Sequence, residues 1–318
     1  CRAKHCVGVS SGTDALYISI RAAALVKAQI VVPALTFIAT LEAVVRAGAT
    51  PVIHDVDPST AILPPMTAPS IPVALYGRPV VTAEEGEDMI VDAAQAHGQK
   101  IGNEIARCFS FYPTKNLGAA GQAGAIVTNN ALFADRCRVL RNHGEGGERF
   151  LHVVFSGNYR MDEIQAAILR AKLPHLKAWT KRRRAIAGYY LRELSSVPGM
   201  IFPPDDPEHV YHIFALRVVD SRLTELAPNT PRLSSHEQRN AVAVFLKNRG
   251  VQVGVRYPVP LYKQPAYLEC LPEKHKKMNF PNAYEWGNTV LNLPIHEMMS
   301  DAQVEYVVQC VRSWENES

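Results

Sequence analysis

Six side chains that together can serve one cofactor follow one another along the first half of the chain. They are Thr13, Phe37, Asp92, Gln95, Ser110 and Lys115. Taken singly they carry little weight, because most lysines are solvated and most aspartates after a strand belong to turns or caps. Their order, with Asp92 in IVDAAQAHG and Lys115 in FSFYPTKNLG, is the informative signal.

Each of these residues can bind, or act on, one part of pyridoxal phosphate. Lys115 can hold the cofactor as a Schiff base and later move protons. Asp92 follows the apolar strand MIV, so its buried carboxylate needs a cationic partner, and a protonated pyridine nitrogen supplies one. Gln95 can reach the ring hydroxyl, and Phe37 offers a flat apolar surface. We therefore predict pyridoxal 5'-phosphate as cofactor, with Lys115 and Asp92 as catalytic residues.

The segment from Gly8 to Gly12 has two competing interpretations. It matches GxSxG between a strand and a helix, the context of a serine-hydrolase nucleophile at Ser10. Against this, no strand precedes it here to supply an oxyanion donor. Alternatively, Gly12, Thr13 and Asp14 open a helix whose free N–H groups suit a phosphate that Ser110 shares, or simply form an ordinary capped start.

The glycine-rich stretch from Gly118 to Gly124 does not fit GxGxxG. It also runs into a strand, GAIVT, whereas a dinucleotide fingerprint must open a helix. The sequence therefore argues against hydride transfer.

The sequence resembles the DegT/DnrJ/EryC1/StrS family of sugar aminotransferases, which have the fold-type I aminotransferase architecture. The resemblance rests on SSGTDAL, VVPALTFIATLEAVVRAGATPV, VDAAQAHG, SFYPTKNLGA, LRNHG, GNYRMDEIQAAILRAKL and RYPVPLYKQPAY, which span almost the whole chain. It implies Lys115 as the Schiff-base lysine and Asp92 on the pyridine nitrogen. The cofactor-binding residues that it implies are Gly12, Thr13, Asp14, Phe37, Asp92, Gln95, Ser110, Lys115 and Asn158. It also implies a homodimer in which Asn158 reaches the phosphate of the neighbouring subunit.

The resemblance further implies transfer of an amino group from glutamate or a similar donor to a ketone on a nucleotide-linked sugar. FSFYPTKNLGA is most similar to members that act at the sugar 3-position. The alternatives are a 4-keto-sugar or aminocyclitol aminotransferase and a catalytically silent cofactor-binding regulator. Relatives that dehydrate sugars have His at the position of Lys115. The expected substrate-binding residues are Tyr112, Arg256, Tyr257 and Tyr262.

The sequence also departs from the family pattern. Relatives usually carry a further segment before the position of Cys1, and the stretches 25–29 and 63–88 are shorter than usual. These differences bear on stability or completeness. Gln122 stands where relatives generally have Asp, and Arg256 and Tyr262 stand where many have His, which bears on substrate identity.

Hydrophobic patterning predicts an α/β fold, with a three-layer αβα large domain built on a mostly parallel sheet at 1–195 and a smaller α+β domain at 196–318. The expected strands are 6–9, 29–32, 51–54, 72–75, 89–91, 107–110, 124–128, 211–218 and 251–255. The expected helices are 13–26, 37–47, 131–141, 161–195 with a break at Pro174, 235–249 and 300–314.

Composition excludes several classes of function. The 318 residues carry a net charge of +4 and hold no apolar run approaching the roughly 20 residues of a membrane span. The basic run 181–184 is interpreted as a solvated helix face rather than a nucleic-acid patch. Six scattered cysteines favour a reducing cytoplasm. His209 and His212 would point to opposite faces of a strand, so no metal site is expected.

Overall fold

The computed structural model describes residues 1–81, 88–219, 233–270 and 278–317. The strands are β1 (His5–Val9), β2 (Gln29–Pro33), β3 (Thr50–His54), β4 (Ile90–Asp92), β5 (Ala106–Ser110), β6 (Gly124–Thr128), β7 (Met200–Ile201), β8 (Phe214–Val218) and β9 (Val290–Leu293). The α-helices are α1 (Gly12–Ala22), α2 (Ile38–Arg46), α3 (Ala131–Arg141), α4 (Glu163–Lys172), α5 (Leu176–Leu194), α6 (Ser235–Asn248), α7 (Pro265–Cys270), α9 (Pro281–Thr289) and α10 (Asp301–Glu317). Part of the shortened stretch 63–88, residues 82–87, lies outside the described residues.

The strands of the first half form the mostly parallel sheet of an α/β fold. One sheet has the order β1-β6-β5-β4, and β2 pairs with β3. The pairs β2–β3 and β4–β5 are parallel, whereas β6 runs antiparallel to both β1 and β5. Parallel bridges from Ser70 to Val31 and Met89, and from Val73 to Asp92, place the segment 70–73 between β2 and β4. The predicted fold class is confirmed.

The predicted strand at 72–75 is not formed as a strand. Only the isolated bridges at Ser70 and Val73 occur there, and a 3-10 helix (Leu75–Gly77) follows. Pro72 explains the difference, because proline has no N–H to continue a ladder.

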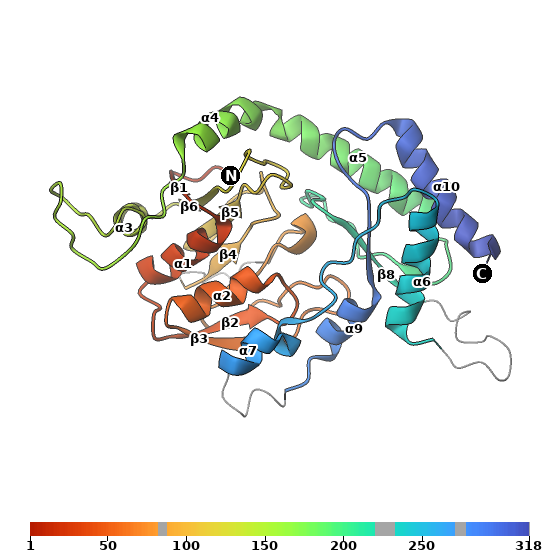
Figure 1. Ribbon diagram of the computed structural model, residues 1–318, viewed down its shortest axis with the longest axis horizontal. Coiled ribbons are helices and arrows are strands. Elements are labelled where there is room, and N and C mark those ends of the chain that lie inside the picture. Colours follow the sequence, from red (N-terminus) through yellow and green to blue (C-terminus); the bar gives the residue numbers. More distant parts are fainter. Residues whose placement is uncertain (82–87, 220–232, 271–277, 318) are drawn as a thin grey trace.

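Helices cover the sheet and connect the two halves of the chain. α1 packs on β5 and β6 and also against α2 and α3, and it lies beside α2 in Figure 1. The long helical segment that follows is broken as predicted, because a 3-10 turn (Leu173–His175) containing Pro174 separates α4 from α5. In Figure 1 these two helices arc along the top of the molecule, and α5 meets α10.

The second half carries a small antiparallel sheet in the order β7-β8-β9. β8 begins at Phe214 instead of residue 211, because Tyr211 has a φ of 44° and a left-handed residue cannot continue a strand. The predicted strand at 251–255 is also wrong, since only Gly254 forms a bridge there, to Asn292 of β9.

Buried apolar side chains form two large clusters among the described residues. The first surrounds the main sheet and also includes Tyr267 of α7 and Trp286 of α9. The second joins the end of α5, from Ile186 to Leu194, to β8, α6 and α10. The domain boundary at 195/196 therefore stays a proposal, because residues on either side of it enter both clusters. In the described part of the chain no helix has the length and apolar character needed to cross a membrane.

Candidate active site

A cavity of about 630 Å³ lies where the ends of β4 and β5 and the start of α1 meet segments from the second half of the chain. The predicted site residues that line it are Gly12, Thr13, Phe37, Asp92, Gln95, Ser110, Tyr112, Lys115, Arg256 and Tyr257. Asp14, Asn158 and Tyr262 are not among the lining residues. The structure thus gathers side chains that lie up to 245 residues apart in sequence, from Gly12 to Tyr257.

One end of the cavity is suited to a phosphate. α1 starts at Gly12 with Ser11 as its N-cap, whose hydroxyl accepts the N–H of Asp14 (3.0 Å). A Cβ at Gly12 would lie 2.7 Å from Cβ of Ser110, so only glycine lets the helix start approach the end of β5 this closely. Free helix N–H groups and the Ser110 hydroxyl therefore face the same space.

The carboxylate of Asp14 does not line the cavity and bonds to other side chains of the protein. It accepts hydrogen bonds from Ser10 Oγ (2.6 Å) and Ser11 Oγ (2.9 Å) and pairs with Arg46 (2.7 Å). Although burial favours the neutral acid, the hydrogen bonds from Ser10 and Arg46 hold the pKa of Asp14 below its usual value. Ser10 thus donates to a carboxylate, and no histidine in the described part of the chain bonds to it as a base, so the geometry that a serine nucleophile requires is not formed there.

Asp92 ends β4 as a buried carboxylate, 6% exposed, at the cavity wall. It accepts hydrogen bonds from Thr40 Oγ1 (2.8 Å) and the N–H of Ala94 (3.1 Å). No described basic side chain forms an ion pair with it. Burial raises its pKa, while these hydrogen bonds and the charge of Lys115 oppose the rise. A buried carboxylate that forms no ion pair with a described side chain fits a ligand that brings a positive charge.

Lys115 enters the cavity from the loop after β5. The loop is closed by hydrogen bonds from Lys115 N–H to Tyr112 O (2.8 Å) and from Ala119 N–H to Phe111 O (2.8 Å). Within the described ranges, nothing accepts a hydrogen bond from the Lys115 amine. Burial lowers its pKa, and the charge of Arg256 lowers it further, against the opposing effect of Asp92. A lysine amine without a hydrogen-bond acceptor among the described residues therefore shares the cavity with the carboxylate.

Gln95 is held by its neighbours in one orientation. Its Oε1 accepts the N–H of Tyr76 (2.7 Å), so its Nε2 is directed to the hydroxyl of Tyr257 (3.3 Å). The Tyr257 ring lies 5.7 Å from that of Phe37, between centroids, and both line the cavity. Phe37 is 53% exposed and offers the open apolar face that was predicted.

His97 supports the site from behind and does not line it. It donates from Nε2 to the carbonyl of Ser110 (2.7 Å) and lies against the rings of Phe109 and Phe111. Burial lowers its pKa to about 3. His97 is therefore a buried, hydrogen-bonded residue with a structural position behind the cavity.

The sequence analysis missed several residues of the cavity wall. They are Leu16, Thr36, Ala39, Val73, Ala94, Thr114, Arg183, His212, Ile213, Ile295 and His296. Those after residue 180 come from segments with no motif of their own. The buried apolar spacing of α5 was the available signal for Arg183, since that residue lies three before Ile186 on the same face.

The prediction of a solvated basic face at 181–184 is wrong for Arg183. It is 5% exposed and donates hydrogen bonds to the carbonyls of Tyr211 (3.2 Å) and Ile295 (3.0 Å). It also pairs with Glu297 (2.9 Å). The residue that looked like surface charge in the sequence joins α5 to two other segments.

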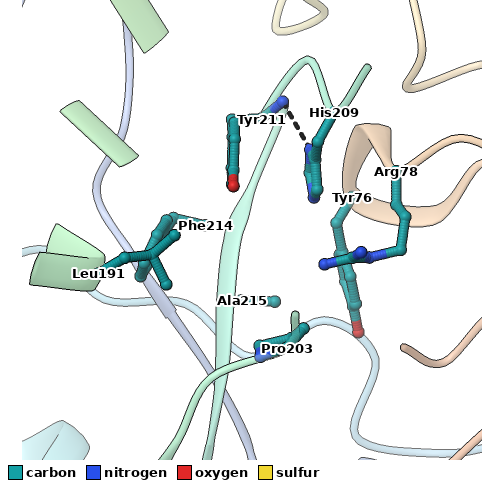
Figure 2. A pocket seen from close by; sticks show the side chains of 8 residues that line it. All are labelled: Tyr76, Arg78, Leu191, Pro203, His209, Tyr211, Phe214 and Ala215. Atoms are coloured by element: carbon teal, nitrogen blue, oxygen red, sulfur yellow. Dashed lines mark hydrogen bonds between the residues drawn. The ribbon is translucent and has the colours of Figure 1, made fainter. Parts of the chain in front are cut away.

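A second crevice, of about 10 Å³, lies between Tyr76, Arg78, His209 and Tyr211 (Figure 2). That space holds about one water molecule at most. His209 and Tyr211 stack with 3.8 Å between ring centroids, and the N–H of Tyr211 donates to His209 Nδ1 (2.9 Å). The strand argument for His209 and His212 does not apply, because both precede β8. This crevice is part of the packing between segments and too small for a substrate.

Two further predicted residues lie outside the cavity. Asn158 is exposed just before α4, and the one hydrogen bond that its Oδ1 accepts from a described residue is a long one from the N–H of Arg160 (3.4 Å). Tyr262 packs edge-on against Phe280, with 5.0 Å between ring centroids. Their predicted roles stay predictions.

Comparison with known proteins gives one consistent result. The model of the DegT/DnrJ/EryC1/StrS aminotransferase family matches residues 1–312. The erythromycin biosynthesis sensory transduction protein EryC1 of Saccharopolyspora erythraea is 36% identical, over 98% of this chain and 86% of that protein. The dTDP-3-amino-3,4,6-trideoxy-alpha-D-glucose transaminase of Streptomyces venezuelae is 35% identical, over 99% and 84%. The crystal structure of S. venezuelae DesV in complex with a ketimine intermediate matches with a TM-score of 0.85 and 34% identity, over 100% and 86%.

Proposed function

Because this chain belongs to the DegT/DnrJ/EryC1/StrS aminotransferase family, we propose that its cavity passes an amino group from an amino acid to the ketone of a nucleotide-linked sugar. The protein is a pyridoxal-phosphate-dependent aminotransferase. The observation that supports the proposed site is that Lys115 and Asp92 share one cavity, and that among the described residues the Lys115 amine has no hydrogen-bond acceptor and the buried Asp92 carboxylate has no ion-pair partner.

The residues present fit the cofactor. Asp92 would hold the pyridine nitrogen, Gln95 the ring oxygen, and Phe37 the ring face. Ser110 and the N–H groups at the start of α1 would hold the phosphate. When bound, pyridoxal phosphate carries the amino group and takes up the electrons of the C–H bond that is broken beside the nitrogen.

Lys115 would move the protons. Burial lowers the pKa of the amine and so favours its neutral form, which is the form that can take the proton from the α-carbon of the donor. The amine would return a proton to the carbon that was the ketone of the acceptor. The nearby charge of Arg256 favours the neutral amine, and Asp92 opposes it.

The acceptor class is inferred from the relatives and from the open side of the cavity. The S. venezuelae relative is named as a transaminase of a dTDP-linked 3-amino sugar. In this chain Arg256 is exposed, lines the cavity, and its guanidinium has no partner among the described residues. That cation can meet a diphosphate or a carboxylate, while Tyr112 and Tyr257 can meet a sugar ring. We favour a ketone at the 3-position and glutamate as donor.

A substrate panel tests this function. After reaction with glutamate and removal of the excess, the protein is offered nucleotide-linked 3-keto and 4-keto sugars, a keto-cyclitol and 2-oxoglutarate. Transfer to the 3-keto sugar is expected. Preferred transfer to the 4-keto sugar or cyclitol would correct the substrate, turnover with 2-oxoglutarate alone would confine the enzyme to amino-acid chemistry, and no turnover at all would leave a silent cofactor-binding protein.

We further infer a homodimer that shares its active sites. The segment after α3 projects from the body of the molecule in Figure 1, and it exposes Phe150 (74%), Val153 (62%) and Phe155 (94%). Exposed apolar side chains gathered on one segment mark an interaction surface. Asn158 follows on the same segment with its amide largely unused, so it would be free to reach a phosphate in the neighbouring subunit.

Mixed dimers test the shared site. A Lys115→Ala subunit paired with an Asn158→Ala subunit places both lesions in one site and leaves the other site intact. The mixed dimer should then exceed the Asn158→Ala homodimer per intact Lys115, because losing one hydrogen bond to a charged phosphate costs about 1.5–3 kcal/mol at limiting cofactor. No gain in purified mixed dimers would mean that Asn158 acts within its own chain or not at all.

A further inference from the structure

His212 lies in a short segment whose backbone is held by hydrogen bonds on both sides of this residue. The segment precedes β8, and its backbone is tied to the first half of the chain. The N–H of Val210 donates to Gly77 O (2.9 Å), and the N–H of Ile213 donates to Tyr76 O (3.2 Å). The His212 side chain lines the same cavity as Lys115. Its position is therefore set by the contact between the two halves of the chain.

The protonated nitrogen of His212 is set by Asn116, the residue after Lys115. Asn116 is 3% exposed, and its Nδ2 donates to Val210 O (3.1 Å). Its Oδ1 consequently faces Nδ1 of His212 at 3.0 Å. If the Asn116 amide were flipped, its oxygen would face the carbonyl oxygen of Val210, and two acceptors would meet. Because Oδ1 can only accept, Nδ1 of His212 must carry the proton and Nε2 must carry the lone pair.

Nε2 of His212 is left for a ligand. No described residue donates a hydrogen bond to this nitrogen. It is also not one of the buried side-chain atoms that lack a hydrogen-bond partner, so it is open to the cavity. Burial, together with the charges of Lys115 and Arg183, holds the pKa of His212 well below its usual value, so the ring is neutral. In the cavity, Nε2 of His212 can therefore accept a hydrogen bond from a hydroxyl group. Because the ring is neutral, it does not attract an anion.

We propose that His212 Nε2 accepts a hydrogen bond from the hydroxyl next to the ketone of the acceptor sugar and so makes the enzyme specific for that sugar. This inference rests on the proposed function, since it assigns the sugar to one wall of the cavity. The anionic groups of both substrates match the cations of the cavity, such as Arg256. A sugar hydroxyl instead needs an acceptor, and His212 supplies one of fixed direction.

Two variants of His212 distinguish the role of Nε2, which faces the cavity, from the role of Nδ1, which bonds to Asn116. His212→Asn keeps an amide N–H for Asn116 but is too short to present an acceptor to the cavity. His212→Gln extends an amide oxygen toward the place of Nε2. His209→Asn is the matched control, because His209 is buried on the same segment but faces the small crevice of Figure 2.

Single-turnover kinetics with each substrate give the test. Glutamate carries no sugar hydroxyl, so all three variants should react with it within about threefold of the parent rate. With a nucleotide-linked 3-keto sugar, His212→Asn should lose about 10- to 100-fold in kcat/KM, and His212→Gln should recover part of the loss. An analogue lacking the hydroxyl next to the ketone should react equally with the parent and with His212→Asn, and His209→Asn should still distinguish the two sugars.

The outcomes separate this inference from the proposed function. If His212→Asn slows glutamate and the sugar equally, the ring is only structural and the inference is wrong. If the parent enzyme treats the sugar and its deoxy analogue alike, or His212→Asn is unimpaired on the sugar, the inference alone fails. If the parent enzyme reacts with glutamate but with no nucleotide-linked keto sugar, the proposed function and the inference fail together.

Discussion

The two walls of the cavity differ in how their side chains are held. On the wall from the first half, which we term the cofactor wall, Asp92 and Ser110 end strands and Gly12 begins a helix. On the wall from the second half, the substrate wall, Arg183 and His212 are placed by hydrogen bonds to distant segments. The first wall is fixed by the ends of regular elements and the second by long-range contacts.

The charges on the two walls are also used differently. The cofactor wall leaves the Asp92 carboxylate and the Lys115 amine without an ion pair among the described residues, which makes both available to a ligand. On the substrate wall Arg183 is saturated by carbonyls and Glu297. We infer that losses on the cofactor wall reduce catalysis, whereas losing Arg183 reduces stability.

The largest effect is expected at Lys115. Lys115→Ala should lower turnover at least about 10³-fold, because the covalent attachment and the proton transfer are lost together. The cofactor should still bind without a covalent bond. Reduction with borohydride, digestion and peptide mapping locate the attachment in the parent protein, and a pyridoxyl label on any other lysine would refute the assignment. Lys172→Ala is the control, since Lys172 donates to Gly118 O (2.7 Å) in the same loop and should not abolish turnover.

Asp92→Asn should have opposite effects on activity and on stability. Activity should fall about 10²-fold or more, because a buried ion pair with the cofactor is lost at constant volume. In the cofactor-free protein the same change should raise the thermal midpoint at neutral pH. The folded pKa of Asp92 is raised, so the cost of its buried charge appears as the pH rises above the unfolded value of about 3.9, and the gain should shrink toward that pH. Transamination at the parent rate would show that Asp92 is not the pyridinium partner.

On the substrate wall, Arg183→Met should lower the free energy of unfolding by about 2–3 kcal/mol, because buried carbonyls and Glu297 lose their donor. Arg182→Met is the matched control on the same helix, since Arg182 pairs with the exposed carboxylate of Asp301, and an ion pair with an exposed partner is worth about 1 kcal/mol or less. Denaturant titration of both variants measures the difference. Equal losses would contradict a special structural role for Arg183.

The smallest effect is expected from Arg256→Gln. Removing this charge should move the pKa of the Lys115 amine up toward its usual value, whereas Asp92→Asn should move it further down. The pH dependence of amine labelling at Lys115 in the cofactor-free protein measures both shifts. Because Arg256 is exposed, its effect should weaken at about 1 M salt, where charges are screened beyond about 3 Å. A shift in the same direction for both variants would contradict this account of the cavity charges.

Local patterns were sufficient for most of the cofactor wall. Alternating strands and helices predicted the α/β sheet, and Pro174 predicted the break between α4 and α5. Asp92 was identified because it follows an apolar strand, and Ser110 was identified from its place in the order of cofactor residues and in the family motif SFYPTKNLGA. The strand expected at 72–75 failed because Pro72 leaves only isolated bridges, which an apolar run does not reveal.

The sequence by itself therefore determined the family, the order of the cofactor-wall residues and the elements that carry them. Only the tertiary structure decided that Arg183 is buried, that His212 and His296 line the cavity, and that Asp14 turns to Arg46. The physical reason is the range of the forces. Strand, helix and cap preferences act between residues a few positions apart, whereas the substrate wall depends on hydrogen bonds such as that of Asn116 to His212, which join segments nearly 100 residues apart.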